Sequence, residues 1–147
     1  MTRLLVDTSV LIKWFHSTGE DELAESRALR AAHAAGELTA HIIDLALYEV
    51  GNVLTRALRW TAADVADQLD DLRAIFGTPL VATPEWLLDA AALAADHDLS
   101  YYDAAWAAAA RGLGVPLVSA DGRLVSAGLA ESPTMVAARL GLRRSSR

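Results

Sequence analysis

The sequence contains no cysteine. Disulfides, a thiolate zinc site and a cysteine nucleophile are therefore excluded, and we expect a protein of a reducing compartment, the cytoplasm. No uninterrupted apolar run approaches the roughly 20 residues that a membrane-spanning helix needs, and the N-terminus lacks the pattern of a signal peptide. The sequence predicts a protein that is neither exported nor embedded in a membrane.

Positive charge and histidine are scarce as well. The formal net charge of −6 argues weakly against a surface that attracts polyanions as a whole, although a local basic rim remains compatible with it. The four histidines form no H-E-x-x-H motif, so a histidine zinc site is not indicated. Arginines gather at the C-terminus, where about 140–147 is expected to be a flexible basic tail that either contacts phosphate or is simply solvated.

The pattern of apolar residues predicts one α/β domain over 1–147. Short apolar runs indicate strands at 3–6, 39–43, 80–83, 116–120 and, at an edge, 134–138. Helical periodicity and capping signals indicate helices after Asp7, at 21–35, 45–59, 61–76, 84–97 and 100–113, and after Asp121. Because parallel neighbours need crossover connections, this alternation predicts a parallel sheet of four to five strands covered on both faces.

Two aspartates follow predicted strands directly. Asp7 ends the first strand and Asp121 follows the fourth, so both should lie at the carboxyl edge of the sheet, where sites in such folds are found. Taken singly, an aspartate in this position is more often the N-cap of the next helix than a catalytic residue, and Asp44 is expected to cap its helix in the same way. Their shared edge favours a functional interpretation for Asp7 and Asp121.

Two further acids belong to the predicted helices. Asp103 is the only acid in the apolar segment YYDAAWAAAARGL, where it either forms a capping box with Ser100 or holds a cation. Glu49 lies on a polar stripe with Asn52 that is otherwise explained as a solvated helix face. Hard oxygen ligands without cysteine or paired histidine favour Mg²⁺ or Mn²⁺ over zinc.

Four stretches in this order resemble one family. They are VDTSVLIKWF from residue 6, LALYEVGNVLTRAL from residue 45, LSYYDAAWAAAA from residue 99 and LVSADGRL from residue 117. Together they resemble the PIN-domain ribonucleases, and within them the VapC-type toxins of bacterial toxin–antitoxin pairs. The resemblance implies a three-layer α/β/α PIN-like fold with a central parallel sheet and a metal-dependent endoribonuclease.

The resemblance also implies a set of site residues and partners. Its acidic cluster corresponds to Asp7, Glu49, Asp103 and Asp121, as catalytic and metal-binding residues, with Thr8, Ser9 and Asn52 in supporting positions. The partners it implies are an RNA substrate, a VapB-type antitoxin that blocks the site, and a second copy of the chain.

Four carboxylates around a divalent ion support a specific chemistry. The ion lowers the pKa of bound water so that hydroxide attacks an RNA phosphate, leaving 5′-phosphate and 3′-hydroxyl ends. Asp7, Glu49 and Asp103 are expected as the main ligands, with Asp121 serving a second ion or an outer position, and the general base stays unassigned. Lys13, Arg111, Arg123 and the terminal arginines are candidates for the rim that contacts RNA.

Two other functions are compatible with parts of the pattern. An aspartate-nucleophile phosphatase also begins with a strand that ends in aspartate, but it requires a second aspartate where this chain has Ser9. A non-catalytic module that binds nucleic acid or protein on the same fold is the main alternative to the enzyme. The presence of all four acids argues against it.

Overall fold

A computed structural model describes residues 1–142 of the chain, and the arginines of the expected basic tail, within 143–147, lie outside the described residues. Three strands form a parallel sheet in the order β2-β1-β3, with β1 at Arg3–Val6, β2 at Thr39–His41 and β3 at Leu117–Val118. Leu5 of β1 pairs with His41 on one side and Leu117 on the other. The fold is α/β, as expected, with fewer regular strands among residues 1–142 than predicted.

Single parallel bridges extend this sheet on both sides. Leu80 bridges to Ile43 next to β2, and Glu131 bridges to Val118 next to β3. The predicted strand at 80–83 is therefore reduced to one residue, because Thr83 has to cap the following helix and exposed Val81 has no strand to pair with. The parallel direction of these segments agrees with the prediction, but the expectation of four to five regular strands is wrong.

The prediction of an edge strand at 134–138 is wrong. These residues belong to a helix, α8 at Pro133–Leu140, whose boundaries have clear local causes. The Ser132 side chain accepts a hydrogen bond from the Met135 amide, Pro133 occupies the first turn, and Gly141 ends the helix in the left-handed region. Capping and packing of Val136 against the core outweigh the strand preference of its β-branched residues.

The remaining helices follow the predicted segments closely. They are α1 at Thr8–Phe15, α2 at Leu23–Ala34, α3 at Leu45–Asn52, α4 at Ala62–Phe76, α5 at Pro84–His97, α6 at Tyr101–Leu113 and α7 at Gly122–Ser126. Thr61 and Ser100 cap α4 and α6 as predicted. Asp44 does not cap α3, because its backbone is already helical at φ −62° and ψ −23°.

The helix predicted over 45–59 changes its geometry halfway. It is α-helical to Asn52 and continues as a π-helix, η1, at Val53–Ala57. Such wide turns are rare and often lie at functional sites. Here the change begins next to residues that line the cavity described below.

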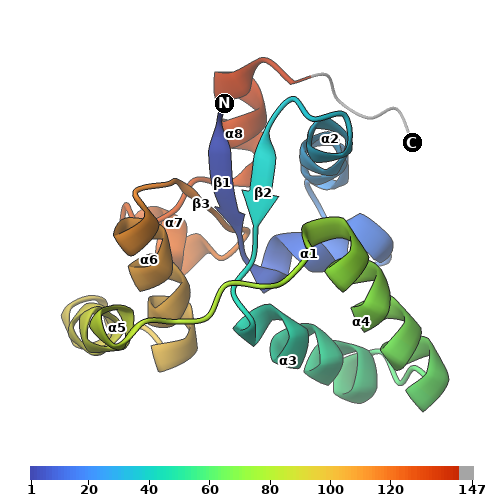
Figure 1. The fold of residues 1–147 in the computed structure, drawn as a ribbon, viewed down its shortest axis with the longest axis horizontal. Helices are drawn as coiled ribbons and strands as arrows, with labels where there is room; N and C mark the ends of the chain where they lie inside the picture. Colours follow the sequence, from blue (N-terminus) through green and yellow to red (C-terminus); the bar gives the residue numbers. More distant parts are fainter. Residues whose placement is uncertain (143–147) are drawn as a thin grey trace.

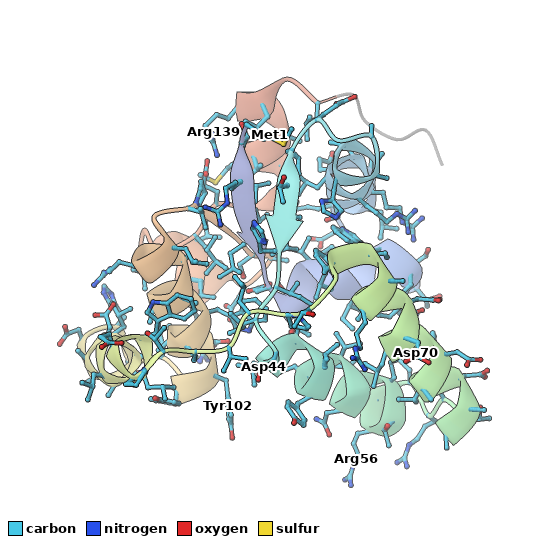
Figure 2. The ribbon with its side chains drawn as sticks, viewed as in Figure 1. Met1, Asp44, Arg56, Asp70, Tyr102 and Arg139 are labelled. Atoms are coloured by element: carbon cyan, nitrogen blue, oxygen red, sulfur yellow. The ribbon has the colours of Figure 1, made fainter. Side chains whose placement is uncertain are left out.

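The helices cover the sheet from both sides. Figure 1 shows α5, α6 and α7 on one side of the strands and α1, α2 and α4 on the other, with α3 beyond the carboxyl ends of β1 and β2. Charged side chains such as Arg56 and Asp70 point outward, whereas the strands are buried (Figure 2). No helix within residues 1–142 has the length and apolar character needed to cross a membrane.

Helices α5 and α6 pack at a close contact between Trp86 and Gly112. A Cβ atom added at Gly112 would overlap the indole ring of Trp86. Gly51 of α3 provides the opposite case, because its added Cβ would meet only Leu69 Cδ1, at 3.7 Å.

We expect opposite effects from two identical substitutions. Gly112→Ala should lower the free energy of unfolding by about 1–3 kcal/mol, because the new methyl group overpacks the α5–α6 contact. Gly51→Ala should raise it by about 0.5–1 kcal/mol, since alanine has the higher helix propensity and the site has room. Urea denaturation of both variants measures the two values, and equal effects would contradict the close contact.

Candidate active site

Asp7 and Asp121 lie at the carboxyl edge of the sheet, as predicted from the strand ends. Asp7 follows β1 and caps α1, with its Oδ1 accepting a hydrogen bond from the Ser9 amide at 3.1 Å. Asp121 follows β3 and caps α7, with its Oδ1 accepting from the Arg123 amide at 2.9 Å. Both residues are helix caps, and both also face a common cavity.

One cavity of about 320 Å³ collects the predicted residues. It is lined by the four acids Asp7, Glu49, Asp103 and Asp121, by the three supporting residues Thr8, Ser9 and Asn52, and by Ile12, Val53 and Trp106. The acids come from β1, α3, α6 and the end of β3, so segments far apart in the sequence meet here. The structure brings every predicted site residue together, while their functional roles remain a prediction.

Two neutral donors hold the Glu49 carboxylate. The Thr8 hydroxyl donates to Glu49 Oε1 at 2.9 Å, and the Trp106 indole N–H donates to the same oxygen at 2.7 Å. Hydrogen bonds to a charged acceptor are stronger than neutral ones. Sequence reasoning missed Trp106, although its position three residues after Asp103 places both side chains on one face of α6.

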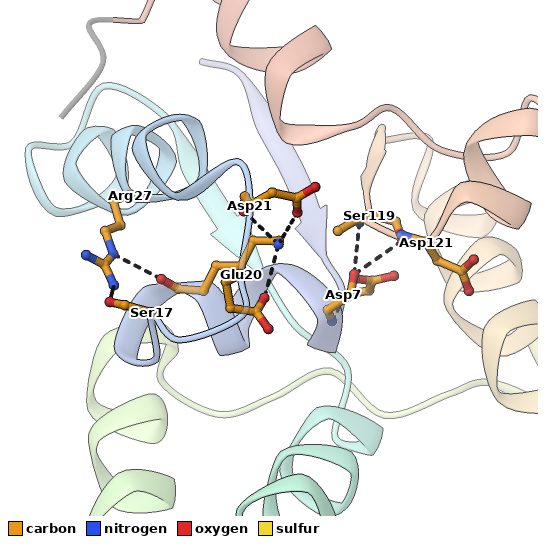
Figure 3. A network of polar contacts seen from close by, with 10 residues as sticks. Asp7, Ser17, Glu20, Asp21, Arg27, Ser119 and Asp121 are labelled. Atoms are coloured by element: carbon orange, nitrogen blue, oxygen red, sulfur yellow. Dashed lines mark hydrogen bonds and ion pairs between the residues drawn. The ribbon is translucent and has the colours of Figure 1, made fainter. Parts of the chain in front are cut away.

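Two serines organise the other side of the cavity. The Ser9 hydroxyl donates to Asp7 Oδ1 and accepts from the Ala120 amide at 2.9 Å, which ties α1 to the end of β3. Fully buried Ser119 accepts from the Asp121 amide at 3.0 Å. Figure 3 shows Asp7 and Asp121 with Ser119 between them. Sequence reasoning did not identify Ser119, which lies two residues before Asp121.

The acids destabilise one another in the absence of a cation. The pKa of Asp7 is raised to about 6, mainly by burial and to a smaller extent by the Glu49 charge, although hydrogen bonds from Ser119 and Ser9 oppose the increase. Burial and the neighbouring Asp121 charge also raise the pKa of Asp103. Among residues 1–142, none of the four carboxylates forms an ion pair with lysine or arginine.

Of the cations expected at a basic rim, Lys13 does not reach the surface. Lys13 is only 3% exposed, and its ammonium group forms ion pairs at 3.0 Å with both Glu20 and Asp21 (Figure 3). Its assignment to an RNA-binding rim is therefore wrong, because its helical position points it into the gap between α1 and α2. Arg111 pairs with Asp89 at 3.4 Å, and Arg123 is exposed next to Asp121.

The donor set of the cavity suits a hard divalent cation. All four acids supply oxygen atoms, and a cation would relieve the repulsion that raises the pKa of Asp7 and Asp103. Within the described residues, no three acidic or histidine side chains are close enough to form a complete metal-binding group. The ligands fit by chemistry and by their common cavity, and their approach to an ion would require side-chain rotation.

Comparison with known proteins identifies a family and a curated relative. The PIN-domain family profile matches residues 4–128. Ribonuclease VapC3 of Pyrobaculum aerophilum is 35% identical over 126 residues, which cover 83% of this chain and 92% of that protein.

Solved structures share the fold at lower sequence identity. PAE2754 from Pyrobaculum aerophilum has a TM-score of 0.70 at 24% identity, covering 95% of this chain and 90% of that one. VapC20 of Mycobacterium tuberculosis, described as a toxin that cleaves the sarcin–ricin loop, has a TM-score of 0.64 at 21% identity, covering 85% and 95%. A toxin–antitoxin complex from Klebsiella pneumoniae has a TM-score of 0.63 at 18% identity, covering 88% and 97%.

The raised pKa of Asp7 predicts how stability depends on pH in EDTA. A carboxyl group with a folded pKa of about 6 and an ordinary value of 3.8 favours folding below pH 4 and loses this contribution as pH rises through 6. The difference corresponds to roughly 3 kcal/mol at neutral pH. Asp7→Asn keeps an N-cap side chain and should therefore increase the free energy of unfolding at pH 7.5 by about 1–3 kcal/mol.

Urea denaturation of wild type and Asp7→Asn at pH 4 and pH 7.5 measures this contribution. The stabilisation should fall to about 0.5 kcal/mol at pH 4, where folded Asp7 is protonated and nearly half of the unfolded chains carry the proton as well. An equal difference between the two proteins at both pH values would show that the charge of Asp7 is not its cause.

Proposed function

The chain belongs to the PIN-domain family and is a homologue of the VapC-type ribonucleases, and on this premise we propose that it is a metal-dependent endoribonuclease acting as the toxin of a VapBC-type pair. The observation that carries the proposal is the meeting of Asp7, Glu49, Asp103 and Asp121 in one cavity without a cationic partner among residues 1–142. Such a set of carboxylates is suited to divalent-metal chemistry.

The proposed cofactor is Mg²⁺ or Mn²⁺. When bound, the ion supplies an activated water and neutralises charge on the phosphate that is cleaved. Asp7, Glu49 and Asp103 are the residues that would hold it, and Asp121 would serve a second ion or an outer position. Hydrolysis in this way leaves 5′-phosphate and 3′-hydroxyl ends.

The side chains around the acids have separate proposed roles. Thr8 and Trp106 keep Glu49 Oε1 directed by two hydrogen bonds, which fixes one carboxylate before the ion arrives. Ser9 directs Asp7 in the same way. Because these donors are uncharged, they orient the acids without competing with a cation for the cavity.

A protein antitoxin is the proposed regulator. One solved structure that shares the fold is a toxin–antitoxin complex, which supports a partner of this kind for the present chain. An acidic cavity attracts a cationic side chain, so an antitoxin arginine or lysine inserted there would exclude both the ion and the RNA. The proposed assembly is a homodimer that forms a larger complex with the antitoxin.

Cleavage of total bacterial RNA by the purified chain tests the proposed activity. We expect discrete cuts in Mg²⁺ or Mn²⁺, none in EDTA, and a loss of at least about 100-fold in Asp7→Asn, because one ligand of the ion that activates the water is removed. Asp70→Asn is the matched control, since exposed Asp70 on α4 lies outside the cavity and should leave cutting unchanged.

Mapping of the RNA ends identifies the target and the product chemistry. Absence of cutting by the folded, antitoxin-free wild type would contradict the nuclease proposal. The same result would favour a non-catalytic module on the PIN fold.

Trp106→Phe tests the positioning of Glu49. The indole N–H bond to a carboxylate contributes about 1.5–3 kcal/mol, so its loss should lower kcat roughly 10- to 100-fold with little change in KM for RNA. The metal concentration for half-maximal activity should rise as well. Trp14→Phe is a matched control, because the buried Trp14 Nε1 has no hydrogen-bond partner among residues 1–142. Equal kinetic losses in both variants would contradict the positioning role.

A further inference from the structure

Two exposed tyrosines precede two of the acids in the sequence. Tyr48, just before Glu49, is 76% exposed, and Tyr102, just before Asp103, is 61% exposed. Both line a second cavity, of about 350 Å³, together with Leu45, Glu49 and Asn52. Because Glu49 and Asn52 also line the carboxylate cavity, the two cavities share a wall.

Neither tyrosine has a structural role within the described chain. Their hydroxyl groups make no hydrogen bond and their rings stack on no other aromatic ring among residues 1–142. Neighbouring Tyr101 differs, since its hydroxyl donates to the Leu87 carbonyl at 3.0 Å. Figure 2 shows Tyr102 extending from α6 away from the body of the molecule. Both rings are available to a ligand.

We propose that Tyr48 and Tyr102 form a subsite for an unpaired nucleobase of the RNA, next to the phosphate that is cleaved. This inference rests on the proposed nuclease function. Tyrosine rings offer flat faces on which any base can stack. Asn52 has no side-chain hydrogen bond within residues 1–142, so its amide is free to pair with the edge of that base.

The charge of the surroundings favours a base over a phosphate at this position. The tyrosine cavity has no lysine or arginine in its lining within residues 1–142 to attract a phosphate, and the wall that it shares with the carboxylate cavity contains Glu49. A nucleobase and a tyrosine ring are both uncharged, so they can meet beside the acids. With Lys13 buried in ion pairs, such neutral contact replaces part of the expected basic rim.

The subsite defines a substrate class. The faces of paired bases are covered by their stacked neighbours, whereas bases in loops, bulges and single strands can be turned outward. The expected substrate therefore has an unpaired nucleotide adjacent to the cut. A continuous duplex of the same sequence should be cleaved poorly.

Cleavage of a short unstructured RNA with a known cut site tests the subsite. Tyr48→Ala and Tyr102→Ala should each raise KM roughly tenfold, since each removes one stacking face, while both phenylalanine variants should keep the wild-type KM. Leu88→Ala is the matched control, because Leu88 is 74% exposed on α5 and lies in neither cavity.

An abasic substrate tests whether the tyrosines contact a base. Removal of the base next to the cut should raise the wild-type KM to that of the double variant Tyr48→Ala/Tyr102→Ala, which has lost both stacking faces, and should leave the KM of the double variant unchanged. A binding assay that needs no cleavage accompanies it: 2-aminopurine at the same position should lose fluorescence on binding to Asp7→Asn, and lose less when Tyr48 and Tyr102 are also alanine.

The outcomes separate the subsite from the proposed function. Unchanged KM and unchanged fluorescence in the tyrosine variants of a protein that still cuts RNA would overturn the subsite alone. A wild type that neither cuts nor binds RNA would overturn both proposals. Tyrosine variants that alter the oligomeric state in light scattering but not RNA binding would assign this surface to a contact between two copies, and would also overturn the subsite.

Discussion

The burial of the Asp7 carboxylate is the constraint on which the rest of the site depends. This side chain is 4% exposed, directly after a strand whose last three residues are buried, and its pKa is about 6 mainly because burial penalises the charged form. A buried charge of this kind is stable only with hydrogen bonds directed at it, and Ser9 and the first turn of α1 supply them. Asp7 therefore caps α1 and lines the carboxylate cavity at the same time, so its structural role and its proposed functional role are compatible.

Glu49 shows how distant segments cooperate at one atom. Its Oε1 accepts from Thr8, 41 positions away in the sequence, and from Trp106, 57 positions away. Helices α1 and α6 thus meet the end of α3 through uncharged donors. Because these donors carry no charge, the cavity keeps its negative charge and with it its preference for a cation. These hydrogen bonds therefore stabilise the individual carboxylates without making them less suited to divalent-metal chemistry.

The strand ends made the positions of Asp7 and Asp121 predictable, because a parallel sheet places such residues at one edge regardless of the details of packing. Trp106 and Ser119 were not predictable in the same way, since a tryptophan in an alanine-rich helix and a buried serine have ordinary structural explanations. The errors at 80–83 and 134–138 share one cause. The residue types in both segments favour strands, but Thr83 caps α5 and Ser132 caps α8. A helix therefore begins directly after the first segment and includes the second.

The position of Lys13 shows what a sequence pattern leaves undetermined about charge. A lysine six positions after the first acid is equally compatible with the rim of a site and with a buried pair, and only packing against Glu20 and Asp21 decides between them. That packing removes one of the cations expected to contact RNA, and Arg111 is engaged with Asp89. Arg123 is still exposed beside Asp121. In the proposed function, recognition beside the acids therefore depends in part on uncharged groups, which gives the two exposed tyrosines a physical reason to be there.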